Sequence, residues 1–263
     1  MRSRGVLRKA RRVVIKVGTS VVSKRNGDVD VGWARSFAEQ VGELRRQGRE
    51  VIVVSSGAIG AGRHVLQLAE RPKTLVEKQA AAAVGQPRLM RVFKDAFRRV
   101  GLVVAQILLT YDDLDSKLRC RNAVNTINLL LKMGVVPIIN ENDTVAVEEI
   151  KFGDNDYLSA LTFEIMGADA LILLTDVDGV LAAGDGRNGE ARVIASVSRA
   201  TWAEVELGIT TATSAGGTGG MKSKVEAARA AVEHGGVAVI ARGKTARVLE
   251  RIFAGEEIGT FFG

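Results

Sequence analysis

Residues 136–156 read VPIINENDTVAVEEIKFGDND, and the fold that we expect of the chain is inferred first from this segment. Its apolar beginning, at 135–139, predicts a buried strand that runs directly into an acidic loop. Ligands of open parallel sheets bind beyond the carboxyl ends of the strands. Carboxylates and amides at that place suit an α-amino acid or Mg²⁺, whereas a solvated acidic loop is the plainer alternative. Asn140 and Asn142 beside acids at the strand end, and Gly153 just before Asp154, favour a binding site.

The rest of the chain alternates short runs of β-branched residues with helical patterns. This alternation is typical of an α/β protein whose largely parallel sheet carries helices on both faces. Helical patterns at 75–84 and 87–100 are separated by Gly85-Gln86-Pro87, which predicts two helices. Without repeats or a low-complexity linker, residues 13–263 are expected to form one domain. Further strands are predicted at 13–17, 51–54, 102–109, 170–174, 237–240 and 258–262.

Composition narrows the class of protein. The 263 residues are 46% hydrophobic and 25% charged, an ordinary balance for a globular protein with a large core. No apolar run approaches the roughly 20 residues that cross a bilayer, so no membrane association is expected. A single cysteine, Cys120, allows no internal disulfide and favours the cytoplasm. His64 and His234 are the two histidines; this disfavours a zinc site and a Ser-His-Asp triad, and we nominate no metal ligand.

Six basic residues and no acid lie within residues 1–12, so they account for six of the seven net positive charges. We interpret this segment as a basic N-terminal arm that is solvated and poorly ordered. A nucleic-acid-binding arm is the alternative. No aromatic residues interleave and no second basic patch follows, so no nucleic-acid partner is expected.

Lys16 follows the first predicted strand, within VIKVGTS. A lysine in a buried strand is costly unless its charge is paired. It could be a snorkelling edge residue or a cation beside a phosphate; backbone N–H groups of Gly18, Thr19 and Ser20 favour the phosphate. The glycines of 57–62 are spaced G-x-x-G-x-G, which does not match a dinucleotide fingerprint. A turn that binds an anion or substrate, with the hydroxyl of Ser56, stays open there.

The stretch 214–224, SAGGTGGMKSK, is the sharpest local signal. Glycines and a threonine run into a helix with lysines in its first turn, and helix N-termini bind anions through free N–H groups and the helix dipole. A Walker A motif fails because Met221 stands where glycine is required. A mobile surface loop is the alternative, but the lysines favour a phosphate cradle. Thr175-Asp176 at another strand end is a weaker signal, because capping would explain it equally well.

Two cationic phosphate sites and one acidic site with amides indicate phosphoryl transfer to a small acceptor. Such transfer depends mostly on positioning and charge neutralisation. A carboxylate acceptor, with a pKa of about 4.3 for a glutamate-like acid, is already ionised at neutral pH. It needs no general base, which agrees with the scarcity of histidine.

In this order, the motifs resemble the amino acid kinase family, in particular its members that phosphorylate glutamate. The resemblance covers nearly the whole chain, and the segments are highly specific as a set. It implies a three-layer α/β/α sandwich around a mostly parallel sheet, and the reaction of L-glutamate with ATP and Mg²⁺ to L-glutamyl 5-phosphate, the first step towards proline. It also implies feedback inhibition by proline and a homo-oligomer. The matching segments are VIKVGTSVV, VIVVSSGAIGAG, KQAAAAVGQPRLM, VVPIINENDTVA, EIKFGDNDYLSAL, LLTDVDGV and GTGGMKSK.

The resemblance also carries roles to individual residues. Ser56, Asp143 and Asn155 fall where the family binds glutamate, while Lys16 and Lys224 would neutralise the transferred phosphoryl group. Asp154 and Asp156 match family acids near the acceptor, Asp154 as a substrate-binding residue and Asp156 as a catalytic one. Nucleotide binding is assigned to Lys16, Gly18, Thr19, Thr175, Asp176, Thr218, Gly219, Gly220, Met221, Lys222, Ser223 and Lys224.

There are two departures from the family pattern. Many bacterial relatives carry a C-terminal PUA domain, and the sequence ends at Gly263 with the kinase segment. Residues 181–189 also lack the Tyr and Asp-Pro common there, so adenine contacts are expected to differ.

Three rival functions follow from the same residues. The nearest is a sister kinase acting on acetylglutamate, aspartate, carbamate or UMP; an α-amino site at Asp143 and Asn155 argues against acetylglutamate. A nicotinamide oxidoreductase would use residues 57–62, but the glycine spacing is wrong. A nucleic-acid-binding protein would use the basic arm.

Overall fold

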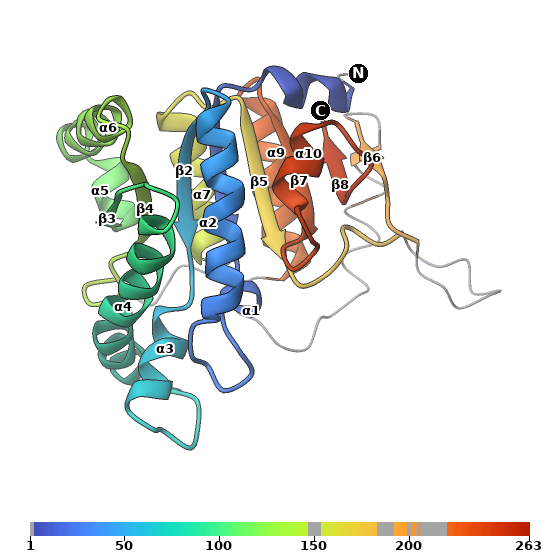
Figure 1. The fold of residues 1–263 in the computed structure, drawn as a ribbon. Coiled ribbons are helices and arrows are strands. Elements are labelled where there is room, and N and C mark those ends of the chain that lie inside the picture. Colours follow the sequence, from blue (N-terminus) through green and yellow to red (C-terminus); the bar gives the residue numbers. More distant parts are fainter. Residues whose placement is uncertain (1–2, 147–153, 183–191, 199–200, 203–204, 206–219) are drawn as a thin grey trace. The chain divides into compact units, whose positions relative to one another are not determined.

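The computed structural model describes residues 3–146, 154–182, 192–198, 201–202, 205 and 220–263 (Figure 1). The chain forms two compact units. Unit 1 contains residues 1–16 and 152–263, and unit 2 contains residues 17–151. None of the helices in these ranges combines the length and apolar composition needed to cross a bilayer. The single domain expected for residues 13–263 stays a prediction.

Unit 2 is built on three parallel strands in the order β3-β4-β2. The register pairs Val53 with Ile138 and Leu109 with Glu141, so the carboxyl ends of these strands share one edge. Helix α2 lies in front of β2 in Figure 1. The strands are β2 (Glu50–Ser55), β3 (Val104–Leu109) and β4 (Val136–Glu141), and the helices are α1 (Thr19–Val22), α2 (Val31–Arg46), α3 (Ala58–Val65), α4 (Leu75–Arg98), α5 (Tyr111–Asp115) and α6 (Lys117–Lys132).

Unit 1 orders its strands β1-β5-β7-β8-β6. β5 and β7 are parallel, and β8 runs antiparallel to β7. Every residue of β5 is buried, as expected for a strand covered on both faces. Its elements are η1 (Arg4–Lys9, a 3₁₀ helix), β1 (Arg12–Val17, whose last residue belongs to unit 2), α7 (Asp154–Ile165), β5 (Ala170–Thr175), β6 (Ser196–Val197), α9 (Met221–Glu233), β7 (Val237–Arg242), α10 (Val248–Phe253) and β8 (Thr260–Phe262).

The predicted fold class is confirmed, because helices flank mostly parallel strands. In Figure 1, α9 lies behind β7 and α10 lies in front of it. The expected strand at 258–262 begins only at Thr260, and the one at 102–109 begins at Val104. Such differences at element ends are ordinary, because terminal residues make few ladder hydrogen bonds.

The prediction of two helices within 75–100 is wrong, because α4 is one continuous helix with Pro87 inside it. A capping box begins it: the N–H of Glu77 donates to Thr74 Oγ1 at 3.2 Å, and the N–H of Thr74 donates to Glu77 Oε2 at 3.0 Å. Buried apolar residues on both sides of Pro87 hold the helix together despite the missing N–H. Gly85 is not a helix break but a contact point: a Cβ there would lie 1.8 Å from the carbonyl oxygen of Ala58 on α3.

The expectation of a poorly ordered N-terminal arm is wrong for residues 4–12. Residues 4–9 form η1, and Leu7 is fully buried. The guanidinium of Arg4 donates to the carbonyl oxygens of Ile258 and Gly259, both at 2.7 Å. Because a guanidinium presents several donors in a fixed fork, a basic residue can tie down a chain end by binding backbone oxygens. At least one positive charge of this segment, that of Arg4, therefore fixes the N-terminal segment to the rest of unit 1.

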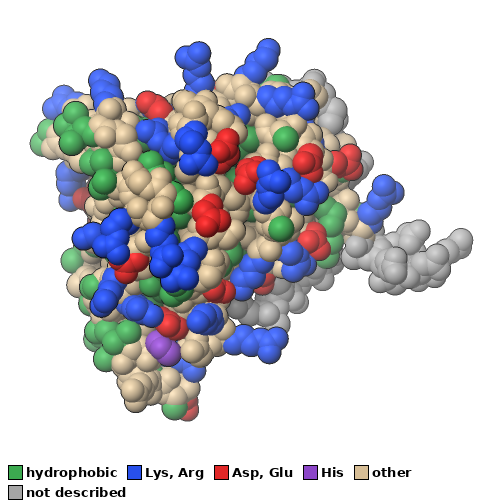
Figure 2. All heavy atoms as spheres, in the orientation of Figure 1, with side chains coloured by type: hydrophobic (Ala, Val, Ile, Leu, Met, Phe, Trp, Pro, Cys, Tyr) green, Lys and Arg blue, Asp and Glu red, His purple; other side chains and the backbone are tan. Residues whose placement is uncertain are grey.

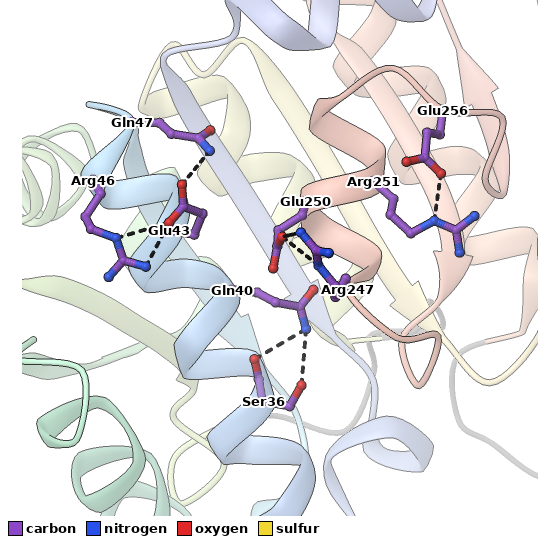
Figure 3. A network of polar contacts seen from close by, with 9 residues as sticks. All are labelled: Ser36, Gln40, Glu43, Arg46, Gln47, Arg247, Glu250, Arg251 and Glu256. Carbon is purple, nitrogen blue, oxygen red and sulfur yellow. Dashed lines mark hydrogen bonds and ion pairs between the residues drawn. The ribbon is translucent and has the colours of Figure 1, made fainter.

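An aromatic cluster joins α2 to α4 within unit 2. Trp33 stacks on Phe37 with ring centroids 4.9 Å apart, and Phe37 meets Phe93 and Phe97 edge to face. The outer surface of α2 is polar, with Glu43 accepting from Arg46 at 2.8 Å (Figure 3). Exposed pairs of this kind contribute little, about 0.3–0.5 kcal/mol each. The buried rings hold the two helices together, and the surface ion pairs add little.

Candidate active site

Two lysines converge on one carboxylate in unit 1. Lys16 Nζ lies 2.6 Å from Asp156 Oδ1, and Lys224 Nζ lies 3.2 Å from Asp156 Oδ2. Lys16 comes from the end of β1, Asp156 from the first turn of α7, and Lys224 from the first turn of α9. The structure thus brings together the three residues that the sequence nominated as catalytic.

All three charged groups of this cluster are buried, with relative exposures of 5% for Lys16, 1% for Asp156 and 7% for Lys224. Burial disfavours an ionised carboxylate, but the charges of Lys16 and Lys224 and the hydroxyl of Ser223 outweigh it. The pKa of Asp156 therefore lies below that of an ordinary aspartate. The cluster sets two lysine side chains against one carboxylate, an arrangement suited to a further negative charge.

Ser223 fixes Asp156 from a third direction. Its Oγ donates to Asp156 Oδ2 at 2.7 Å and also contacts the carbonyl oxygen of Gly220 at 2.8 Å. Gly220 is the N-cap of α9, so the positive end of this helix begins beside the carboxylate. The sequence nominated Ser223 for nucleotide binding; in the structure its hydroxyl contacts Asp156 and the backbone of Gly220.

The other nominated residues of 214–224 divide into two groups. Met221 and Lys222 open α9, and exposed Lys222 lies 3.9 Å from Glu226 on the same helix. Thr218 and Gly219 lie outside the described residues. Near the start of the chain, Gly18 is the N-cap of α1 and its carbonyl accepts from the N–H of Val21 at 3.0 Å, while Thr19 is exposed.

Thr175 is the last residue of β5 and Asp176 follows it, so both lie at a strand end as predicted. Thr175 Oγ1 donates to Asp176 Oδ1 at 3.1 Å. Arg242 ends the neighbouring strand β7 in register with Thr175, and its guanidinium binds Asp178 through two hydrogen bonds of 2.6 and 3.0 Å. Sequence reasoning missed Asp178 and Arg242. The signal that could have found Arg242 is the one that marked Lys16: a cation at the carboxyl end of a parallel strand.

Unit 2 carries a second polar group at the shared carboxyl edge of β2 and β4. Ser56 follows β2, and its N–H donates to the carbonyl of Val17 at 3.1 Å. Asn140 on β4 is buried, and its Nδ2 donates to Gln86 Oε1 of α4 at 2.9 Å. Asp143 is half-buried just after β4. The sequence nominated Ser56 and Asp143 but missed Gln86, which a helical pattern alone could not place against a strand.

The start of the acidic loop is held by its own backbone and by α4. Asn142 accepts the N–H groups of Val145 and Ala146 at 3.1 Å through its carbonyl oxygen, and Gln79 Nε2 donates to the carbonyl of Ala146 at 3.1 Å. Residues 147–153 of the loop lie outside the described residues. In unit 1, Asn155 is buried in the first turn of α7, while Asp154 is the first residue of that helix.

The glycines of 57–62 serve the packing of α3. Gly57 caps this helix with φ of +111°, a conformation that disfavours other residues, and a Cβ there would lie 2.7 Å from Val22. A Cβ on Gly62 would lie 1.7 Å from the carbonyl oxygen of Ala81 on α4. The left-handed backbone of Gly57 and the close approach of α3 to α4 at Gly62 therefore explain these two glycines without a ligand.

Residues 11–242 match the model of the amino acid kinase family, so the chain belongs to this family. A glutamate 5-kinase from Geobacter sp. (strain M21) is 48% identical over 257 residues, which are 98% of this chain and 69% of that protein. Glutamate 5-kinases from Syntrophotalea carbinolica and Geobacter sulfurreducens are 49% and 47% identical. Among solved structures, UMP kinase from Bacillus anthracis superposes with a TM-score of 0.63 at 17% identity, covering 97% of this chain and 96% of that chain.

Proposed function

We propose that this protein is a kinase that transfers the γ-phosphoryl group of ATP to the side-chain carboxylate of L-glutamate, forming L-glutamyl 5-phosphate. The observation that carries the proposal is the buried cluster of Lys16, Lys224 and Asp156 beside the N-terminus of α9. Relatives named glutamate 5-kinase, at 46–49% identity over almost the whole chain, support glutamate as the acceptor.

In this proposal the two lysines neutralise charge on the phosphoryl group during transfer. Negative charge builds on the equatorial oxygens in the transition state, and prearranged cations stabilise it at little reorganisation cost. Asp156 keeps two like charges together in the absence of substrate, because its carboxylate contacts both ammonium groups. Asp156 thus acts as an organiser of the cations, and the acceptor carboxylate needs no base.

Mg²⁺ fits this site as an ion that arrives with the nucleotide. Mg²⁺ is usually bound through one or two carboxylates together with substrate phosphates. In the part of the chain that the structure describes, no three acidic, histidine or cysteine side chains gather as a metal cage, and Asp156 is engaged by two lysines. When bound together with ATP, Mg²⁺ would neutralise further charge on the phosphates. In this proposal the protein itself contributes the positive charges of Lys16 and Lys224 to the phosphate site.

The remaining nominated residues complete the proposal. Ser56, Asp143, Asp154 and Asn155 bind glutamate, and Thr175 with Asp176 contacts the nucleotide, as do Gly18, Thr19 and the first residues of α9. The chain acts in the cytoplasm as a homo-oligomer. Support for these roles comes from the match of each residue to the family motif and from its position at a strand end or helix start.

The test is a coupled assay of ADP release with glutamate, acetylglutamate, aspartate, carbamate and UMP as acceptors. Glutamate should give the highest kcat/KM, and hydroxylamine should trap the acyl phosphate as a hydroxamate. Omitting Mg²⁺ should abolish turnover. A higher kcat/KM with any of the other four acceptors would reject the assignment.

Proline is proposed as an inhibitor that occupies the glutamate site. It shares the ammonium and α-carboxylate groups of glutamate but has no side-chain carboxylate to accept the phosphoryl group. Proline should raise the KM for glutamate while leaving kcat unchanged, and Asp143→Ala should weaken glutamate and proline together. Inhibition that saturating glutamate cannot overcome would contradict a shared site.

A further inference from the structure

A second cationic site lies on unit 2, in a cavity of about 340 Å³ between α2 and α4. Val31, Val92 and Ala96 supply apolar lining. Lysine and arginine side chains gather over these two helices in Figure 2. The charged residues that line the cavity are five arginines and one acid: Arg35, Arg88, Arg91, Arg98, Arg99 and Asp95.

Two of these arginines already have carboxylate partners. Arg88 binds Asp28 at 3.1 Å through Nη2, and Arg98 lies 3.5 Å from Asp95. The side chains of Arg35, Arg91 and Arg99 make no ion pair or hydrogen bond with any residue in the described ranges. Three guanidinium groups without an ion-pair partner therefore line one concavity that contains a single acid, Asp95, so positive charge predominates there.

The chemistry of this lining selects a compact ligand with several negative charges. Guanidinium groups bind phosphate oxygens in a bidentate way, and Arg is favoured wherever planar recognition of phosphate is needed. The volume lies within the range of about 300–1,000 Å³ for small-molecule sites and is enclosed on two sides by helices, which favours a small anion over a nucleic acid. The buried rings of Phe37, Phe93 and Phe97 hold α2 and α4 in place, so the cavity is formed before a ligand arrives.

We propose that this cavity is a binding site for a pyrophosphate group, either as the free anion or as the terminal group of a nucleoside diphosphate. Arg35 on α2 lines it from one side, and Arg91 on α4 and Arg99 at the C-cap of α4 line it from the other. The apolar lining leaves room for a non-polar part of a larger ligand. The site is separate from the cluster around Asp156 and does not depend on the proposed kinase activity.

The experiment is isothermal titration of the full chain with inorganic pyrophosphate and, separately, with CDP, in buffer without Mg²⁺. Arg35→Ala and Arg91→Ala should each raise the Kd for pyrophosphate at least tenfold, since a hydrogen bond to a charged group contributes about 1.5–3 kcal/mol. Arg121→Ala is the matched control: an exposed arginine on α6, outside the cavity, whose loss should change the Kd less than twofold. Tighter binding of CDP than of pyrophosphate would identify a nucleotide as the larger ligand.

Two further variants separate this cavity from the active site and from general charge. Lys224→Ala removes a cation of the proposed active site, which is itself suited to phosphate, and should leave pyrophosphate binding in the cavity between α2 and α4 intact, because Lys224 belongs to the other unit. Loss of binding in Lys224→Ala with retention in Arg91→Ala would place the anion in the active site and overturn the proposal. Equal weakening by Arg121→Ala, no binding at millimolar pyrophosphate, or binding of RNA but not of pyrophosphate would also overturn it. Melting curves of the arginine variants should match the wild type, because the substituted arginines are exposed.

Discussion

Replacing Asp156 by Asn tests the central electrostatic claim, because it removes one charge and almost no volume. Lys16 and Lys224 would then be two buried ammonium groups facing a neutral amide. The hydroxyl of Ser223 could still donate to the amide oxygen, so the local packing should survive. The change therefore isolates the role of the carboxylate as a counter-ion for the two lysines.

The magnitude follows from the two ion-pair distances. At an effective dielectric constant of about 20, unit charges 2.6 Å apart attract by roughly 6 kcal/mol and charges 3.2 Å apart by roughly 5 kcal/mol. Desolvation of three buried charges offsets most of this gross attraction. Removing one partner of a buried pair typically costs about 3–5 kcal/mol. We expect the free energy of unfolding to fall by that amount and Tm by roughly 6–20 °C.

Urea unfolding of wild type and Asp156→Asn measures the loss, with Asp178→Asn as the matched control. Asp178 pairs with Arg242 at the surface, so its loss should cost less than about 1 kcal/mol. ATP should stabilise Asp156→Asn more than the wild type, because the phosphates replace the missing negative charge. Adding Lys16→Met to Asp156→Asn should recover stability by removing one unpaired cation. Equal losses for the two Asp→Asn variants, or no recovery in the double variant, would refute the reasoning.

Three other outcomes follow from the same structure. Lys16→Ala and Lys224→Ala should each lower kcat by about 10²–10³-fold in the coupled ADP assay while changing the KM for glutamate much less, and wild-type kcat in both would contradict a transition-state role. Gly85→Ala should destabilise the fold by about 1–3 kcal/mol or more, because its Cβ would lie 1.8 Å from a backbone oxygen. The control Gly42→Ala should be tolerated, because the nearest atom to its Cβ would lie 3.6 Å away. Similar Tm values for the two variants in thermal melts would show that α3 and α4 can separate freely. The pKa of Asp156 is lower in the folded state than the ordinary value of 3.8, so its carboxylate should stabilise the fold above that pH and lose this contribution as pH falls through the folded pKa. The difference in unfolding free energy between wild type and Asp156→Asn should therefore narrow below about pH 4. A difference that stays constant with pH would argue against the lowered pKa.

Local patterns in the sequence were sufficient for the class of fold and for the positions of several nominated residues at strand ends and helix starts. Runs such as 170–174 are apolar at every position, which is typical of strands covered on both faces, and the structure buries all of them. The same rule placed Lys16 and Thr175 at carboxyl ends of strands, and glycine followed by lysine marked the beginning of α9. These signals are local, because periodicity, capping and chain reversal depend on neighbouring residues.

Other features required the tertiary structure because they depend on residues far apart in the sequence. No pattern in the sequence alone puts the carboxylate of Asp156 between Lys16 and Lys224, since these residues come from three different elements. From the sequence, Gly85 was expected to interrupt a helix. In the structure it lies inside α4, where the missing side chain allows α3 to pack closely. From the sequence, Arg4 was expected to belong to a solvated arm. In the structure its guanidinium donates hydrogen bonds to backbone oxygens, including that of Gly259. The sequence shows the charge and the conformational freedom of each residue. Which residue lies next to it in space, and so pairs with its charge or packs against it, depends on the tertiary structure.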